Sequence, residues 1–146
     1  MKLKEAEKLA IKLMKKYKLS HWTFKFDNAK RRYGSCSYVK KRITLSKDLT
    51  LIREDDHVTN TILHEIAHAL VGPGHGHDSV WRAKALQIGC NGNRCSNDAK
   101  LPYRWIGVCP NGHTVGKYRR PRSNGSCAVC YPSAYNEKYK FEYSKK

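Results

Sequence analysis

No run of apolar residues in this 146-residue chain approaches the roughly 18 needed to span a bilayer. The N-terminus has no basic segment followed by an apolar core, since its first helical stretch is rich in lysine throughout. We therefore expect a soluble, cytoplasmic protein that is not secreted and has no membrane partner. The chain also lacks internal repeats, low-complexity tracts, a phosphate-binding loop and a Ser/His/Asp arrangement, which leaves few classes of enzyme open.

Acidic residues are scarce as well. The chain has 12 Asp and Glu against 29 Lys and Arg, for a formal net charge of +17. Such an excess creates a positive potential over much of the surface and favours polyanions by counterion release. We therefore expect nucleic acid as a partner. We further predict that this partner is DNA, single-stranded or damaged, and that the protein is a monomer. The alternative is that the basic composition only keeps the protein soluble.

The stretch from Thr61 to Trp81 carries the clearest chemical signal. His64 and His68 lie four residues apart, so on a helix their imidazoles project from one face and can meet on one Zn²⁺ ion. Glu65 is rotated about 100° from His64, which puts its carboxylate beside the metal. In zinc hydrolases of this His-Glu-x-x-His pattern, that carboxylate is the catalytic base toward a metal-bound water. The alternative is a solvated helix whose histidines line up by chance.

A third ligand is expected, because a catalytic zinc usually takes three from the protein. Two histidines, His75 and His77, follow the Gly72-Pro73-Gly74 segment that must end the first helix. A second helix is predicted from about Asp78 to Ile88, with His77 at its entry and facing back toward the first helix. We prefer His77 as the third ligand and keep His75 as the substitute.

Periodicity predicts the remaining elements before residue 98. We expect an amphipathic helix over Lys2–Lys18, a half-buried strand over His21–Phe26, a hairpin of Arg32–Val39 and Arg42–Ser46, and an N-cap at Asp55 or Asp56 for the histidine-bearing helix. Cys36, in the hairpin, is interpreted as a buried small thiol rather than a nucleophile.

A boundary is predicted near residue 98, where short aromatic and basic segments with cysteines begin. For the six cysteines, metal ligation is expected rather than disulfides, because a reducing interior disfavours disulfides. Cys109 and His113 form one close pair, and Cys127 and Cys130 form another, which fits a tetrahedral structural zinc. Metal binding would supply much of the stability of so small a module. Cys90 or Cys95 could instead complete the site, and unrelated free thiols are the remaining alternative.

Between the two pairs lies a run of four cations around one aromatic residue. Its members are Lys117, Tyr118, Arg119, Arg120 and Arg122. Cations neutralise phosphates and a tyrosine ring can stack on an unpaired base, so a hairpin tip here is the best local nucleic-acid candidate. An exposed charged turn is the alternative. A final strand is predicted over Tyr139–Tyr143, packed on this module or on the core.

The residues quoted above resemble the SprT-like metalloproteases, which include bacterial and phage SprT proteins and the eukaryotic Spartan proteases. The resemblance rests on LHEIAHALVGPGHGHDSVWRAKALQIG, on WTFKF, RRYGSCS and RITLS before it, and on the cysteine-containing module after it. It implies that His64, His68 and His77 are zinc ligands and Glu65 the catalytic base. It also implies an edge strand above the cleft, near Gly34-Ser35-Cys36, that holds substrate in an extended form. Asp78 stands where the family has glycine.

The predicted fold is α+β: a zincin-like domain over residues 1–98, with a small antiparallel sheet packed on helices, and a zinc-ribbon-like module over 99–146. The predicted function is a zinc-dependent endopeptidase with one catalytic and one structural zinc. By resemblance to Spartan, its substrates would be proteins bound or crosslinked to DNA, in the nucleoid of a bacterial or phage-infected cell. The alternatives are a nucleic-acid-binding or transcription-associated zinc protein without peptidase activity, and a hydrolase of a non-peptide substrate.

Overall fold

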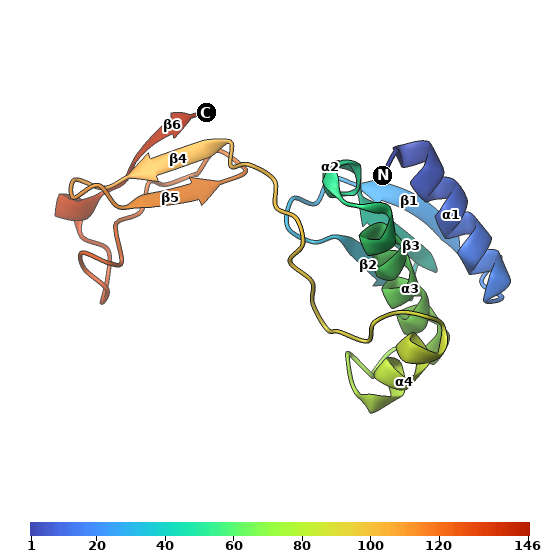
Figure 1. Cartoon of the computed structure of the whole chain (residues 1–146). Coiled ribbons are helices and arrows are strands. Elements are labelled where there is room, and N and C mark those ends of the chain that lie inside the picture. The colour runs from blue at the N-terminus through green and yellow to red at the C-terminus, as the bar shows by residue number, and fades with distance from the viewer. The chain divides into compact units, whose positions relative to one another are not determined.

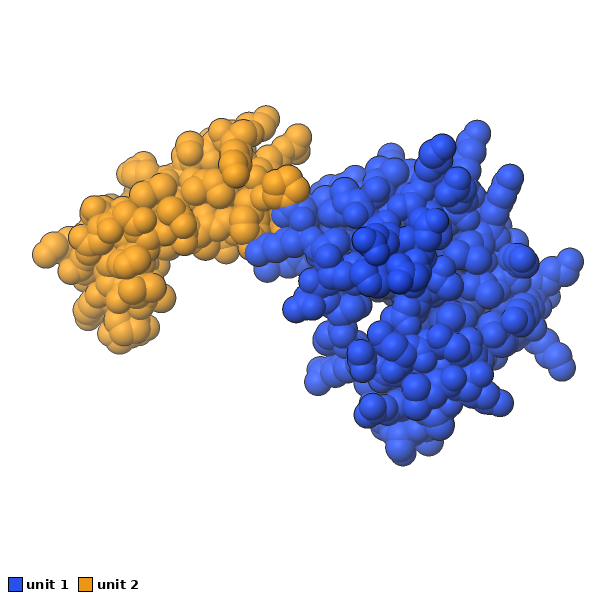
Figure 2. All heavy atoms as spheres, viewed as in Figure 1, with its two compact units in different colours: residues 1–101 blue, residues 102–146 orange.

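Four α-helices and a three-stranded sheet lie in residues 1–101, and a second three-stranded sheet lies in residues 102–146. The computed structural model describes all 146 residues, and Figure 2 shows the two compact units in different colours. The sequence placed the boundary near residue 98, whereas the first unit extends to Leu101, because Asp98 and Ala99 are hydrogen-bonded to it. No helix is long and apolar enough to cross a bilayer.

Helix α1 (Leu3–Lys16) has the amphipathic character predicted for it. Ala6, Ala10 and Met14 recur on one face and are buried, while lysines occupy much of the remainder. The helix ends two residues before the predicted position. Lys18 has a positive φ of 63°, a conformation that no helix continues through.

The first sheet is mixed, so the expectation of a purely antiparallel sheet was wrong. It contains β1 (Thr23–Asp27), β2 (Gly34–Ser37) and β3 (Arg42–Ser46) in the order β1-β3-β2. The predicted hairpin is present as the antiparallel pair β2–β3. However, β1 pairs with β3 in parallel, because β3 takes the centre of the sheet and β1 runs opposite to β2. Ile43 and Leu45 of β3 are fully buried.

The next three helices follow the sheet in the chain (Figure 1). They are α2 (Lys47–Ile52), α3 (Asp55–Val71) and α4 (Ser79–Gln87). Ser46 caps α2 by accepting a hydrogen bond from the backbone of Leu49. The predicted cap of α3 was wrong: Glu54 is the N-cap without a side-chain bond, and the two aspartates lie inside the first turn. Their negative charges stabilise the helix there, because the N-terminal end of the helix dipole is positive.

The core of the first unit lies where α1, α3, α4 and the sheet meet. Val58, Ile62 and Ile66 of α3 are fully buried, and Trp81 and Ala85 of α4 pack into the same cluster. This apolar face holds α3 in place and leaves its polar positions for the site described below.

The C-terminal unit is built on a second sheet, of order β5-β4-β6 (Figure 1). Its strands are β4 (Trp105–Val108), β5 (Thr114–Lys117) and β6 (Glu142–Lys145), with a short 3₁₀ helix over Glu137–Tyr139. All pairings are antiparallel. The predicted final strand over Tyr139–Tyr143 is only partly confirmed: β6 shares Glu142 and Tyr143 with it, whereas Tyr139 ends the 3₁₀ helix. Strand β6 packs on this unit.

Two glycines allow tyrosine rings to lie directly on the second sheet. A Cβ on Gly116 would fall 2.0 Å from the Tyr103 ring, and one on Gly107 would fall 2.7 Å from the Tyr143 ring. These distances are well inside van der Waals contact, so no larger residue fits beneath either ring. Ring-on-glycine packing gives this small unit apolar contact that its few aliphatic residues cannot supply.

Candidate metal centres

Three histidines converge at the C-terminal half of α3. His64 and His68 project from α3, and His77 approaches them from the segment just before α4. The Nε2 atom of His77 lies 3.1 Å from Nε2 of His64 and 3.2 Å from Nε2 of His68. A tetrahedral zinc with Zn–N bonds of about 2.0–2.1 Å places its nitrogen ligands roughly 3.3–3.4 Å apart, so the three rings fit such an ion.

The turn after α3 selects His77 rather than His75. Gly72 ends α3 with a φ of 82°, and Asp78 caps α4 by accepting hydrogen bonds from the backbone of Val80 and Trp81. The other carboxylate oxygen of Asp78 lies 3.0 Å from Nδ1 of His75, which keeps that histidine at the turn. The aspartate that departs from the family glycine is thus the cap of α4.

Trp81 forms the floor beneath the three histidines. Its ring centroid lies 4.6, 5.2 and 4.7 Å from those of His64, His68 and His77. Its indole N–H donates to the backbone carbonyl of His64 at 3.3 Å. One buried aromatic residue therefore fixes the spacing between α3 and α4 and the tilt of the imidazoles.

The histidines are uncharged at neutral pH, as metal ligands must be. Burial lowers the pKa of His64 and His68 to about 4, and the neighbouring imidazoles contribute. Burial also lowers the pKa of His77. The backbone of Asn93 opposes this lowering of the pKa for His64.

Glu65 lies beside the three imidazoles and is only 6 % exposed. Its Oε2 atom is buried without a hydrogen-bond partner. Burial raises the pKa of Glu65 to about 7, and the charge of Arg32 opposes this rise. An orphaned carboxylate oxygen of this kind carries a large cost unless a partner completes it. A polar group held by a metal at the three histidines would be such a partner.

The site opens into a cleft between α3, the start of β2 and the segment after α4. The residues that line it are Arg31, Arg32, Tyr33, Gly34, Asn60, Thr61, His64, Glu65, His68, His77, Arg94, Cys95 and Ser96. Strand β2 is an edge strand, so its outward N–H and C=O groups are unpaired within the sheet. Gly34 fits tightly there: a Cβ would lie 2.9 Å from the carbonyl oxygen of Thr44 and 3.1 Å from Cγ2 of Thr61.

Residues 89–101, called the strap here, form the far wall of the cleft without regular secondary structure. The backbone N–H of Asn91 donates to Asn60 of α3 at 2.8 Å. Asp98 accepts two hydrogen bonds from the buried Arg53, at 2.7 and 2.8 Å. The hydroxyl of Tyr33 donates to the carbonyl of Ala99 at 2.7 Å. The strap is therefore fixed at both ends, and its middle faces the histidines.

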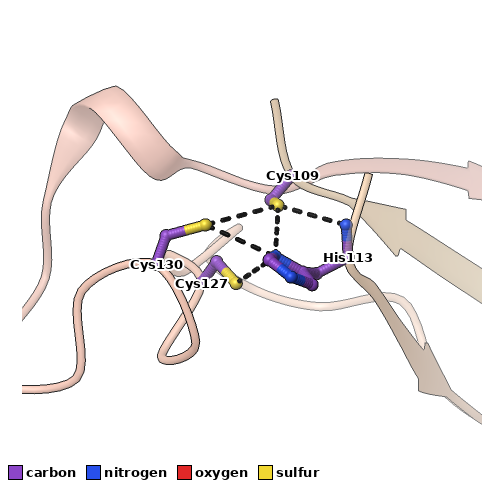
Figure 3. Close-up of side chains that lie close together, drawn as sticks. All are labelled: Cys109, His113, Cys127 and Cys130. Atoms are coloured by element: carbon purple, nitrogen blue, oxygen red, sulfur yellow. Dashed lines mark hydrogen bonds between the residues drawn. The ribbon is translucent and has the colours of Figure 1, made fainter. Parts of the chain in front are cut away.

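A second cluster gathers Cys109, His113, Cys127 and Cys130 in the C-terminal unit, as Figure 3 shows. The Sγ atoms of Cys109, Cys127 and Cys130 lie 3.4, 3.5 and 3.4 Å from Nδ1 of His113. The sulfurs of Cys109 and Cys130 are 3.8 Å apart. Zinc bonds of about 2.3 Å to sulfur and 2.0–2.1 Å to nitrogen separate tetrahedral ligand atoms by roughly 3.5–3.8 Å, which these distances match.

A backbone turn holds the first pair of this cluster, Cys109 and His113. The N–H of Gly112 donates to the carbonyl of Cys109 in a turn where Gly112 has a φ of 87°. Burial raises the pKa of Cys109, but hydrogen bonds from the backbone of His113 and Asn111 outweigh this and bring the pKa down to about 6. A thiol with a lowered pKa binds a metal without a large cost of deprotonation.

A family comparison agrees with the geometry of the first site. The model of the SprT-like family matches residues 4–100, about two thirds of the chain. The chain belongs to the SprT-like family. This family is related to metallopeptidases, and both histidine and cysteine clusters of this SprT-like protein could hold a metal ion. No curated protein matches the chain.

Neither cysteine proposed as a substitute joins the second cluster of the SprT-like protein. Cys90 is buried in the core of the first unit, and Cys95 lines the cleft. Cys36 is half-buried, and burial raises its pKa to about 12, so the thiol is a poor nucleophile.

The cationic run from Lys117 to Arg122 is not a hairpin tip, as the sequence had suggested. The turn of the β4–β5 hairpin is instead the segment from Cys109 to His113. The chain reverses there because Cys109 and His113 must come together in the second cluster. Lys117 ends β5, and the rest of the run continues as an irregular segment. The Tyr118 ring lies 4.8 Å from that of Tyr103, and the Arg120 guanidinium lies 5.8 Å from the Trp105 ring.

Sequence reasoning missed the strap and its anchor. Arg53 has a side chain that is only 2 % exposed, and besides Asp98 it donates to Thr61 and to the backbone carbonyl of His57. Its guanidinium also lies 3.8 Å from the centroid of the Tyr33 ring. No spacing rule links residues 45 positions apart, so only the presence of Asp98 as the one acidic residue of a Gly/Asn-rich segment could have hinted at the pair.

Proposed function

We propose that this SprT-like protein is a zinc-dependent endopeptidase of the zincin type, associated with DNA and acting on proteins bound or crosslinked to it. The observation that carries the proposal is the orphaned Oε2 of Glu65, buried beside three imidazoles, of which His77 has its Nε2 atom within 3.2 Å of Nε2 of the other two. A purely structural metal site has no use for that carboxylate. Membership of a metallopeptidase-related family supports the same chemistry.

In this proposal His64, His68 and His77 hold the catalytic zinc, and Cys109, His113, Cys127 and Cys130 hold a structural one. Zinc, when bound, lowers the pKa of a coordinated water and polarises a carbonyl. Glu65 accepts a proton at Oε2 and returns it to the leaving amine. Its raised pKa suits this exchange near neutral pH.

The open edge of β2 is the part of the site that would hold a peptide. Antiparallel pairs exchange hydrogen bonds at every second position, and the bonded pair of Tyr33 with Ser46 sets the alternation. Gly34 and Cys36 therefore direct their backbone groups away from β3. A peptide segment added at this edge would be extended and would pass the three histidines.

Cleavage assays with Glu65→Gln test the peptidase. Zinc-loaded wild type and variant are incubated with a basic DNA-binding protein, with and without single-stranded DNA, while zinc per chain is counted. We expect cleavage by wild type alone, and about two zinc ions on both proteins, one for each cluster. Glu5→Gln, an exposed carboxylate on α1, is the matched control and should cleave as wild type does. Absence of cleavage by wild type that binds zinc and DNA would favour a binding protein without peptidase activity.

Association with DNA is proposed from the C-terminal unit. Residues 102–146 contain nine Lys and Arg against two Glu, and five residues of the cationic run, Lys117, Tyr118, Arg119, Arg120 and Arg122, are the proposed contacts. Each phosphate contact adds about one to the slope of affinity against salt on logarithmic axes. We expect Arg119→Gln with Arg122→Gln to lower that slope by about two, whereas Lys12→Gln on α1 should leave it unchanged. Equal slopes for all three proteins would remove the run from the DNA site.

A further inference from the structure

The cleft around the three histidines is markedly cationic. Three arginines line it, Arg31, Arg32 and Arg94, and Glu65 is the only acidic residue among the lining side chains. The arginines come from two walls, since Arg31 and Arg32 precede β2 and Arg94 belongs to the strap.

Arg32 and Arg94 reach the cleft from different segments, Arg32 from the residues just before β2 and Arg94 from the strap. Arg32 is already paired with Asp27 at 3.0 Å. Arg94 has no carboxylate partner among the ion pairs of the chain.

The position of Arg94 is set by the strap rather than left to chance. On its N-terminal side, Asn93 bonds to Asn91, which bonds to Asn60 of α3. On its C-terminal side, Asp98 is held by the buried Arg53. An arginine presented by an anchored segment loses less entropy on pairing than one on a free loop. Its planar guanidinium can also donate two parallel hydrogen bonds to one carboxylate.

We propose that the cleft selects peptide segments that carry aspartate or glutamate next to the bond to be cleaved, with Arg94 as the main specificity-determining residue and Arg32 as the second. This inference rests on the proposed peptidase function and names its substrate class. An extended peptide rises about 3.3 Å per residue, so positions within two residues of the scissile bond lie within about 7 Å of it. The acidic residues that the cleft selects lie within two positions of the scissile bond.

Cleavage-site profiling of a peptide library by mass spectrometry tests the proposal. We expect wild type to cut with acidic residues enriched about fivefold within two positions of the cleaved bonds, the size expected from an ion pair with solvent access. Arg94→Gln should lose most of the enrichment, Arg94→Lys should retain much of it, and Arg94→Glu should reverse it toward basic residues. Arg104→Gln is the matched control, because it removes an equal charge from an exposed residue outside the cleft.

The outcomes separate the two proposals. If wild type cleaves nothing, the peptidase function fails. If cleavage depends on Glu65 but shows no acidic enrichment, or if enrichment persists when both Arg32 and Arg94 are changed to Gln, the specificity inference alone fails. Nucleic acid is the other polyanion that these arginines could bind. Binding of labelled oligothymidine to the Glu65→Gln protein is therefore measured as well. If Arg94→Gln weakens that binding while the cleavage profile is unchanged, the arginines serve nucleic acid and the inference is overturned.

Discussion

Changing Asp98 to asparagine should loosen the strap and destabilise the first unit. Arg53 is 2 % exposed and Asp98 is 15 % exposed, so the guanidinium keeps its charge in a site that water barely reaches. Removing one partner of a buried pair costs about 3–5 kcal/mol, because the other charge stays buried. Arg53 retains its bonds to Thr61 and to the carbonyl of His57, which reduces the expected loss to about 2–3 kcal/mol.

Urea unfolding followed by tryptophan fluorescence measures this loss. In a Trp105→Phe background the remaining tryptophans, Trp22 and Trp81, both report the first unit. The control is Asp48→Asn, which breaks the exposed pair of Asp48 with Lys30 and should cost less than about 1 kcal/mol. If Asp98→Asn costs no more than this control, the strap is not anchored by its ion pair.

The pH dependence of the difference in stability between wild type and Asp98→Asn gives a second check. The hydrogen bond from Arg53 holds the pKa of Asp98 below its ordinary value of 3.8. A carboxyl group with a lowered pKa contributes its full stability above that ordinary value and loses it as the pH falls through the lower, folded-state value. The gap between wild type and Asp98→Asn should therefore shrink below about pH 4. A gap that widens below about pH 4 would contradict this assignment.

Three further perturbations follow from the site geometry. Gly34→Ala should destabilise the first unit by about 1–3 kcal/mol in thermal unfolding, because its Cβ would press on two fixed neighbours; an unchanged melting temperature would show that β2 moves freely. Cys127→Ser should lower the zinc count from about two to about one and unfold only the C-terminal unit, as Trp105 fluorescence would report; retention of both ions would exclude the cysteine cluster as a site. In the metal-free protein His64 and His68 should titrate near pH 4 by NMR. Because the unfolded state takes up those protons first, stability should fall as the pH drops from about 6.5 to 4 and level off below; titration near 6.5 would refute the burial argument.

The sequence predicted the local parts of the first site well. Four-residue spacing on one helix brings His64 and His68 together wherever that helix forms, and the Gly-Pro-Gly segment ends it for reasons that need no tertiary context. The place of His77 at the entry of the second helix favoured that histidine, and the structure shows Trp81 as the floor beneath all three rings. These features depend on residues at most about 20 positions apart.

The parts that could not be predicted depend on contacts between distant segments. The parallel pairing of β1 with β3 depends on β3 taking the centre of the sheet, and alternation along a single strand does not report strand order. The strap was similarly hidden, because Arg53 and Asp98 have no shared motif. The position of the cationic run was predicted wrongly, since the turn between β4 and β5 is formed by the segment from Cys109 to His113.

The open edge of β2 also bears on self-association. An unpaired edge can add a strand from a second copy of the chain as readily as from a substrate, which is the usual route to aggregation. Here β2 is only four residues long, and its side chains are small and mostly polar. A partner strand would gain few hydrogen bonds and little apolar contact unless it also reached the metal centre. The edge is thus short enough to discourage pairing between copies at moderate concentration while remaining open to a peptide that binds zinc as well.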